Sequence, residues 1–161
     1  MKQAVYGWHF AANDRKLGYG DNRVIEVGAT HWVANMAKPI ILCEYGLHAS
    51  VNPLDALQYA TGSILSYCRM HGKIVYGDDK MVAQGREYLS VTDADSILHE
   101  FARWCALQVI HLWKAPDVGK RYLETGDDSL KEASREAMRA SWEGSREASR
   151  ASWEASREAS R

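Results

Sequence analysis

The sequence has few cysteines, no long apolar run and almost no net charge. Its three cysteines, Cys43, Cys68 and Cys105, are odd in number, widely spaced and without a C-x-x-C pair. A disulfide framework is therefore not expected, and the thiols are expected to be reduced. The N-terminus, MKQAVYGWHF, resembles no signal peptide, and apolar runs extend over only a few residues. We therefore expect a cytoplasmic protein that does not bind a membrane.

The charge balance argues against a nucleic-acid partner. Lys and Arg number 20 and Asp and Glu 21, which gives a formal net charge of −1, so the chain has no basic field for counterion-driven binding. Apolar residues make up 46% and charged residues 25% of the 161 residues, enough for a packed core. We predict a globular domain over residues 1–126 and a helical segment over residues 127–161.

The C-terminus repeats with a period of eleven residues, as SREAMRASWEG, SREASRASWEA and SREASR. Eleven residues make three helical turns, so the pattern predicts one helix. Two interpretations remain open. In the first, the helix is an arm for self-association, in which the small residues Ala148 and Ala151 let a second helix approach and Trp142 and Trp153 anchor it. In the second, the helix is a solvated product of repeat expansion, because a seam of alanine and serine buries little apolar area.

Residues 1–92 are predicted to be mostly β. Strands are predicted at residues 4–10, 23–27, 30–33, 40–43, 63–70, 73–76 and 81–91. The strand at 30–33 is expected to pair with that at 23–27, and a tight turn at His71 and Gly72 is expected to join two more. One short helix is predicted to begin at Pro53, with Asn52 as its N-cap.

The region after residue 92 is predicted to be helical. Apolar residues from Ile97 to Leu112 follow helical spacing, which predicts a core helix over residues 93–113. A shorter helix over residues 117–124 should end at Gly126. The expected fold class is α+β, a mostly antiparallel sheet packed by one long core helix and followed by a helical C-terminal arm.

Standard motifs for phosphate, dinucleotide, zinc-protease and hydrolase sites are absent. The nearest metal pattern combines Cys43, His48, Cys68 and His71, a ligand set suited to zinc. Its spacing is poor, because successive residues of a strand point to opposite faces. No metal site is predicted.

The most distinctive segment runs from a strand through Gly46, His48 and Ser50 into the capped helix at Pro53. A helix N-terminus attracts anionic or polar groups, so a ligand is expected there. In the alternative interpretation, Ser50 and Asn52 only cap the helix and His48 packs beneath it. The predicted ligand-binding residues are Trp8, His48, Ser50, Lys80 and Arg86.

Aromatic residues are concentrated in the β half of the chain. They either fill the core and the sheet surface or line a pocket in which a nucleobase stacks while a cationic side chain meets phosphate. The aromatic residues are Tyr6, Trp8, Tyr19, Trp32, Tyr45 and Tyr59, and the candidate cations are Arg15, Arg23, Lys80 and Arg86.

Several blocks of the sequence resemble an uncharacterised domain family of bacteriophage, prophage and bacterial proteins. The blocks are GWHF (7–10), CEYGLHAS (43–50), DALQYA (55–60), GDDKMVA (77–83) and VIHLW (109–113). This resemblance covers residues 1–126. It implies a phage protein or a bacterial one, acting in the bacterial cytoplasm, and no particular activity.

The order of three residues is similar to that in ADP-ribosyltransferases of the diphtheria-toxin-like group. That resemblance implies NAD as cofactor, His9 and Tyr59 as the residues that hold it, and Glu87 as the carboxylate that stabilises developing positive charge. The sequence departs from the family where Phe10 follows His9.

Three hypotheses follow. The first is a non-enzymatic module without a cofactor that binds a small polar or nucleotide-like ligand near His48 and has a helical tail for self-association. The second is an NAD-dependent transferase with catalytic His9, Tyr59 and Glu87. The third is a purely structural or interaction protein that acts through its helical tail, residues 127–161, the segment through which a homo-oligomer is also expected. The first two require the bend around His48 and the first strand to enclose a hollow.

Overall fold

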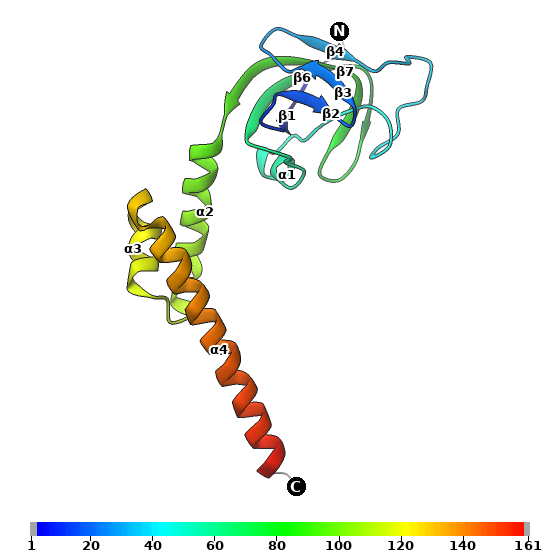
Figure 1. Cartoon of the computed structure of the whole chain (residues 1–161). Coiled ribbons are helices and arrows are strands. Elements are labelled where there is room, and N and C mark those ends of the chain that lie inside the picture. Colours follow the sequence, from blue (N-terminus) through cyan, green and yellow to red (C-terminus); the bar gives the residue numbers. More distant parts are fainter. Residues whose placement is uncertain (1–2, 160–161) are drawn as a thin grey trace. The chain divides into compact units, whose positions relative to one another are not determined.

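The computed structural model describes residues 3–159, with side chains through residue 154. The chain divides into two compact units, residues 1–96 and residues 97–161, and Figure 1 labels most of their helices and strands. The boundary expected at residue 126 falls inside the second unit. Within the described residues, no helix combines the length and the apolar character needed to cross a membrane.

The first unit is built on an antiparallel sheet. Its strand order is β1 (Val5–Ala11), β6 (Ile64–Tyr76), β7 (Met81–Asp93) and β4 (Thr30–Trp32), and β5 (Leu47–Ala49) also pairs with β7. Beyond β5, the Trp8 amide donates to the Ser50 carbonyl at 2.7 Å and the Ser50 amide donates to the Trp8 carbonyl at 2.9 Å. This bridge joins the β5 side of the sheet to β1, so the sheet closes on itself and its edges are partly covered. The long strands β6 and β7 curve strongly (Figure 1).

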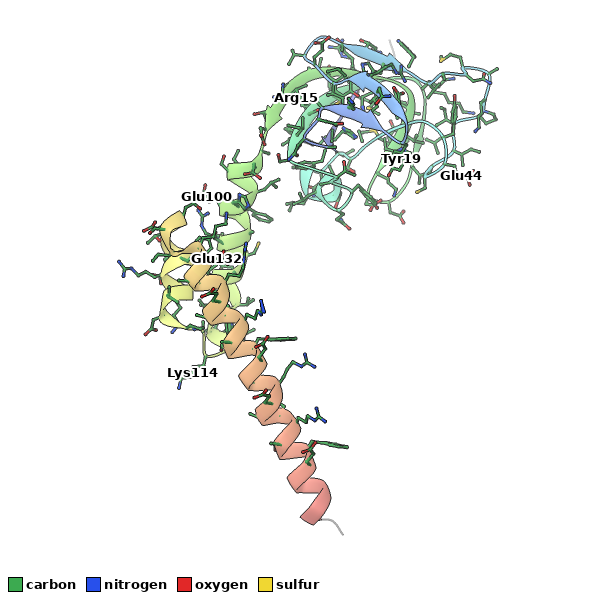
Figure 2. The ribbon with its side chains drawn as sticks, viewed as in Figure 1. Arg15, Tyr19, Glu44, Glu100, Lys114 and Glu132 are labelled. Carbon is green, nitrogen blue, oxygen red and sulfur yellow. The ribbon has the colours of Figure 1, made fainter. Side chains whose placement is uncertain are left out.

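A separate hairpin pairs β2 (Lys16–Gly18) with β3 (Asp21–Val24). Its turn contains Tyr19, which has a φ of 53° and a fully exposed side chain (Figure 2). The predicted pairing of residues 23–27 with residues 30–33 is therefore wrong, because β3 pairs with β2 and β4 pairs with β7. The glycines of residues 18–20 close this hairpin instead.

Two apolar clusters form the core of the first unit. One lies inside the curved sheet, and the other packs around Val82 with Val33 and Ile40. Neighbouring strand residues point to opposite faces, so the consecutive residues Val82 and Ala83 serve different clusters. The members of the inner cluster are Ala11, Ile25, Ala49, Ile64, Cys68, Met70, Met81, Ala83 and Tyr88.

Three predicted strands differ from the structure. The strands predicted at residues 63–70 and 73–76 form the single strand β6 (Ile64–Tyr76), with an irregularity between His71 and Ile74 where Gly72 has a φ of 76°. The glycine accommodates a bulge rather than a turn. Residues 40–43 form only an isolated bridge between Ile41 and Tyr45, and the strand lies later, at β5.

The short helix α1 (Pro53–Leu57) begins as predicted. The Asn52 side chain accepts a hydrogen bond of 3.0 Å from the Leu54 amide, and Pro53 occupies the first turn. The helix has five residues. A helix this short has a small dipole and mostly unsatisfied end groups, so its N-terminus is a weak anion site.

The second unit is helical and confirms the α+β class. Helix α2 (Asp95–Val109) begins just before it and continues into η1 (Ile110–Leu112). Helix α3 (Asp117–Thr125) ends at Gly126, whose φ is 67°, as predicted. After η2 (Asp128–Leu130), α4 (Lys131–Ala159) forms the long C-terminal helix, whose Met138 packs against Gly119 of α3.

The predicted helix over residues 93–113 is present, but no residue of α2 is buried. The two core clusters of the first unit consist of strand and loop residues. Neither cluster includes a residue of α2.

Candidate functional site

The bend around His48 and strand β1 lie side by side, but they enclose no hollow. A Cβ atom added to Gly7 would lie 2.6 Å from Met81 Cε and 3.0 Å from Ala49 Cβ. Ser50 is 2% exposed. Close packing of this kind leaves no room for a ligand between the two segments.

Arg86 is the central polar group of this interior. It is 2% exposed. Its Nε and Nη2 donate to the Tyr88 hydroxyl at 3.0 and 2.9 Å, and its Nη1 donates to the His48 carbonyl. The guanidinium thus ties β7 to the bend before α1. This satisfied, buried arginine is a structural group and is not accessible to a phosphate.

Three histidines surround Arg86 and have lowered pKa values. Burial, then the charges of Arg86 and His48, hold the pKa of His9 well below its usual value. Burial, Lys80 and Arg86 lower the pKa of His48, whose Nε2 also accepts a hydrogen bond of 3.0 Å from the Cys43 amide. Burial, Arg23 and Arg86 lower the pKa of His31. The interior therefore favours neutral imidazoles.

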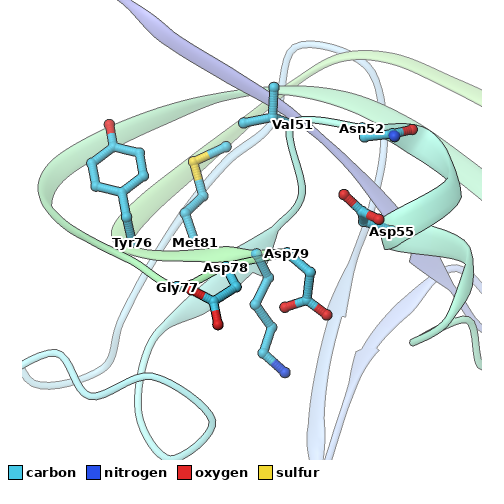
Figure 3. Close-up of a pocket in the computed structure, with 9 residues that line it drawn as sticks. Val51, Asn52, Asp55, Tyr76, Gly77, Asp78, Asp79 and Met81 are labelled. Carbon is cyan, nitrogen blue, oxygen red and sulfur yellow. The ribbon is translucent and has the colours of Figure 1, made fainter.

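A small pocket lies beside the hairpin between β6 and β7 (Figure 3). Its volume is about 90 Å³, well below the size of typical ligand sites. Carboxylates of Asp55, Asp78 and Asp79 surround it. Lys80 Nζ lies 3.8 Å from the Tyr59 ring centroid, and the Tyr59 hydroxyl donates to Asp79. This pocket is too small for a nucleotide.

The three residues of the transferase hypothesis lie in different surroundings. His9 is packed near Arg86, whereas Glu87, the next residue of β7, points to the opposite face of the sheet. Tyr59 is bonded to Asp79 near the hairpin. The structure does not assemble them into one cleft.

The four residues of the zinc pattern are also separate. Cys68 is buried in the inner cluster, and His71 contacts Glu87 on the other face of the sheet. Among the residues that the structure describes, no group of three or more histidine, cysteine or acidic side chains is arranged to hold a metal ion.

Of the other predicted cations, Arg23 is already engaged. Its Nη2 lies 2.6 Å from Asp21 Oδ2, and its Nη1 donates to the Trp32 carbonyl at 2.9 Å. This arginine holds the β2–β3 hairpin to β4, which favours a structural role.

A row of aromatic rings lies on the outer face of the sheet, which we call the aromatic face (Tyr6, Trp8, Trp32, Tyr67, Arg69, His71 and Glu87). Register pairs Trp8 with Tyr67 and Tyr6 with Arg69. The Tyr6 and Tyr67 rings are stacked at 5.7 Å and 11°, and the Trp8 and Tyr67 centroids lie 4.8 Å apart. Tyr6 is 36% exposed.

Charged groups continue the aromatic face across β6 and β7. Arg69 lies 5.7 Å from the Tyr6 ring centroid, and its Nη1 is 3.3 Å from Glu87 Oε2. His71 Nε2 lies 2.9 Å from the same Oε2, and the His71 ring is 5.8 Å from that of Trp32. Arg69 Nε is buried and has no hydrogen-bond partner among the described groups. The face thus offers rings, a cation and a carboxylate on four strands.

Trp8 is the one predicted ligand residue that belongs to the aromatic face. The alternation of Tyr6 and Trp8 along the first strand was visible in the sequence. Tyr67, Arg69 and Glu87 were not found as partners, because their proximity depends on the register of β6 with β1 and β7.

The predicted self-association residues lie on the part of α4 beyond its contact with α3. Trp142 is 59% and Trp153 is 61% exposed, and Ala148 and Ala151 are exposed as well. The last repeat, residues 156–161, lies outside the described side chains. Arg139 and Arg150 pair with Glu143 and Glu154 at 3.4 and 3.2 Å.

Comparisons of this chain with protein-family models, with curated proteins and with solved structures found no match.

Proposed function

We propose that this protein is a non-enzymatic binding module whose aromatic face takes a small, nucleotide-like ligand. The observation that carries the proposal is the continuous row of rings and charged groups from Trp8 to Trp32. A nucleobase presents a flat ring that stacks on an exposed aromatic surface. The base would stack beside Tyr6, with Arg69 meeting phosphate and Glu87 accepting from amino or hydroxyl groups.

The geometry of the face favours stacking over enclosure. The pocket near Asp79 has a volume of about 90 Å³, too small for a nucleotide. A sheet surface needs no cavity to hold a base, since the ring covers the aromatic side chains from outside. With a net charge of −1, long-range attraction contributes little, so binding should depend weakly on salt.

A binding role is favoured over the transferase activity because the three residues of the transferase hypothesis are separated. His9 and Glu87 occupy opposite faces of the sheet, and Tyr59 is engaged with Asp79. General acid–base chemistry needs its groups within hydrogen-bond reach of one substrate.

We further propose that the protein acts in the cytoplasm, and in a bacterial host if the resemblance to phage proteins reflects ancestry. The three cysteines form no disulfide, and two of them are exposed, which fits a reducing compartment.

The proposal is tested by isothermal titration of the full chain with a panel of nucleoside monophosphates and with short single-stranded oligonucleotides. We expect at least one base to bind, and Tyr6→Ala and Arg69→Gln each to weaken the affinity about tenfold, since stacking contributes about 1–3 kcal/mol per base. The two ligand series distinguish a free nucleotide from a base within a strand.

Tyr19→Ala is the matched control, because Tyr19 is fully exposed on the β2–β3 turn, outside the aromatic face. It should bind like the unchanged protein. The proposed function would be refuted if no ligand of the panel bound measurably, or if all three variants bound with equal affinity.

A further inference from the structure

Helix α2, η1 and the residue after η1 carry an exposed apolar stripe, which we call the α2 stripe (Ile97, Phe101, Trp104, Cys105, Leu112 and Trp113). Ile97 is 65%, Trp104 56% and Leu112 72% exposed. The rings of Phe101 and Trp104 stack at 6.1 Å. Apolar side chains of this size are unusual on a solvated surface, and grouped together they mark an interaction site.

Sequence spacing places the first three residues of the stripe, Ile97, Phe101 and Trp104, on one side of the helix. Ile97, Phe101, Trp104 and Gln108 follow 4-3-4 spacing, the seam that pairs helices in coiled coils. Arg103 is the one lysine, arginine or acidic residue between Phe101 and Trp113. Its guanidinium packs against Gly126 at the end of α3 and so leaves the stripe without charge.

We propose that this protein forms a homodimer in which the α2 stripe of one copy packs against the α2 stripe of a second. Charges at the ends of the stripe fit this partner: Glu100 lies near its start and Lys114 directly follows it (Figure 2). In an antiparallel pair, each Glu100 approaches the Lys114 of the other copy, which favours that orientation.

The exposed area is sufficient for such an interface. Five large apolar side chains that each expose about 100 Å² give roughly 1,000 Å² over two copies, the size at which specific interfaces begin. Helix α4 exposes Trp142 and Trp153, but they lie eleven residues apart among small and charged side chains, whereas the α2 stripe groups five large apolar side chains. The dimer contact is therefore assigned to α2 and not to the repeat helix.

The first test is sedimentation equilibrium of the full chain and of two matched variants. The unchanged protein should have twice the 18.1 kDa mass of one chain. Phe101→Ser with Trp104→Ser should give a monomer, whereas Trp142→Ser with Trp153→Ser should stay dimeric. Circular dichroism checks that both variants keep their helices. A monomeric unchanged protein, or a dimer lost in the α4 variant and kept in the α2 variant, would overturn the proposal.

The second test does not rely on disrupting the stripe. Cys43 and Cys105 are exposed, whereas Cys68 is buried and burial raises the pKa of its thiol to about 11. A bis-maleimide that spans about 15 Å can join the Cys105 thiols of two copies, because paired helix axes lie 8–10 Å apart and an offset of several residues along the axes adds about 1.5 Å per residue. It should cross-link Cys43→Ser into a covalent dimer and leave Cys105→Ser monomeric. Equal cross-linking of both variants would contradict the α2 contact.

Discussion

Arg86 organises the interior of the first unit through groups that carry no negative charge. Its hydrogen bonds go to the Tyr88 hydroxyl and the His48 carbonyl, and none of the described carboxylates forms an ion pair with it. His9, His31 and His48 are therefore held near an uncompensated positive charge. Each additional proton in this interior works against the fold.

Acidification should weaken the fold through these histidines. Their pKa values in the folded protein are below the usual 6.5, so the unfolded chain binds more protons below about pH 6.5. Stability is fully present above that value and is lost as the pH falls toward the lowered pKa values. For the buried His9 ring, the loss is about 1 kcal/mol per pH unit. Urea denaturation at pH 7.5 and pH 5.5 measures the difference.

The His9→Gln variant serves as the control for this pH effect, because it removes one titrating group and should reduce the difference. Asp21 and Asp93 have pKa values below their usual 3.8 and do not titrate in this range. A free energy of unfolding that is unchanged from pH 7.5 to pH 5.5 would contradict the assigned shifts.

The sequence was informative about which residues are distinctive and less so about where their side chains point. His48, Ser50 and Arg86 do lie in one neighbourhood, but Ser50 and Arg86 are buried, and the Trp8 side chain lies on the outer face of the sheet. Arg86 and Glu87 are adjacent in sequence and lie on opposite faces, and only the register of β7 decides which is inside.

At the scale of the elements, glycines decide how tightly the strands approach each other. Gly46 has a φ of 136°, and a Cβ added there would collide with Val82 Cγ2 and lie 3.1 Å from the Ala83 carbonyl oxygen. Glycine at this position lets the chain before β5 pack directly on β7.

Gly46→Ala should therefore destabilise the protein by about 2–4 kcal/mol, through backbone strain and overpacking together. Gly28→Ala is the matched comparison. Gly28 also has a positive φ, of 86°, but a Cβ there would meet nothing within 4 Å, so the cost should be about 1 kcal/mol. Thermal unfolding of both variants measures the difference, and equal losses would show that packing against Val82 does not matter.

Helix α4 offers the opposite case. Gly144 lies inside the helix with open space around its Cα. Gly144→Ala should stabilise the helix by about 0.5–1 kcal/mol, because alanine loses less backbone entropy on folding. Circular dichroism at 222 nm during a thermal scan should show higher helicity and a later transition.

Gly126→Ala provides the contrast for this substitution. Gly126 has a φ of 67°, and a Cβ there would lie 2.6 Å from Arg103 Nη2. This variant should lower the stability of the second unit. A gain from Gly126→Ala, or a loss from Gly144→Ala, would contradict the described helix ends.

Elements defined by local pattern were predicted well. Helix α1, which begins at Pro53, has a clear N-cap, and helix α3, which ends at Gly126, has a clear C-cap. The strands β1, β4 and β7 coincide with alternating or β-branched runs of the sequence. The strands β2 and β5, three residues each, were missed, because their residues form strands only through partners elsewhere in the chain. The prediction of a turn at Gly72 is wrong for a similar reason, because the bulge depends on the pairing of β6 with β7.

At the scale of the whole molecule, the α+β class was predictable and the division of the chain was not. The eleven-residue repeat predicts a domain boundary after residue 126. In the structure, α3 packs with α4 in one unit that begins at residue 97. The contact of Met138 with Gly119 joins a non-repeated helix to a repeated one. Repeat boundaries in sequence therefore do not coincide with packing boundaries here.

The proposed division of labour gives each unit one surface. The first unit offers the aromatic face for a ligand, and the second offers the α2 stripe for a second copy. Because the two surfaces share no residue, ligand affinity should be the same in the unchanged protein and in the Phe101→Ser, Trp104→Ser variant. Titration of both with the nucleotide that binds best checks this, and a large loss of affinity in the variant would mean that the two functions are coupled.

The most direct test of the aromatic face is chemical-shift mapping of the ¹⁵N-labelled protein during titration with that nucleotide. The perturbed amide and indole signals should belong to the outer positions of β1, β6, β7 and β4, namely Tyr6, Trp8, Trp32, Tyr67, Arg69, His71 and Glu87. Perturbations centred on Asp55, Asp78 and Asp79 beside the hairpin, or a spectrum unchanged at millimolar nucleotide, would contradict the aromatic face as the ligand-binding surface.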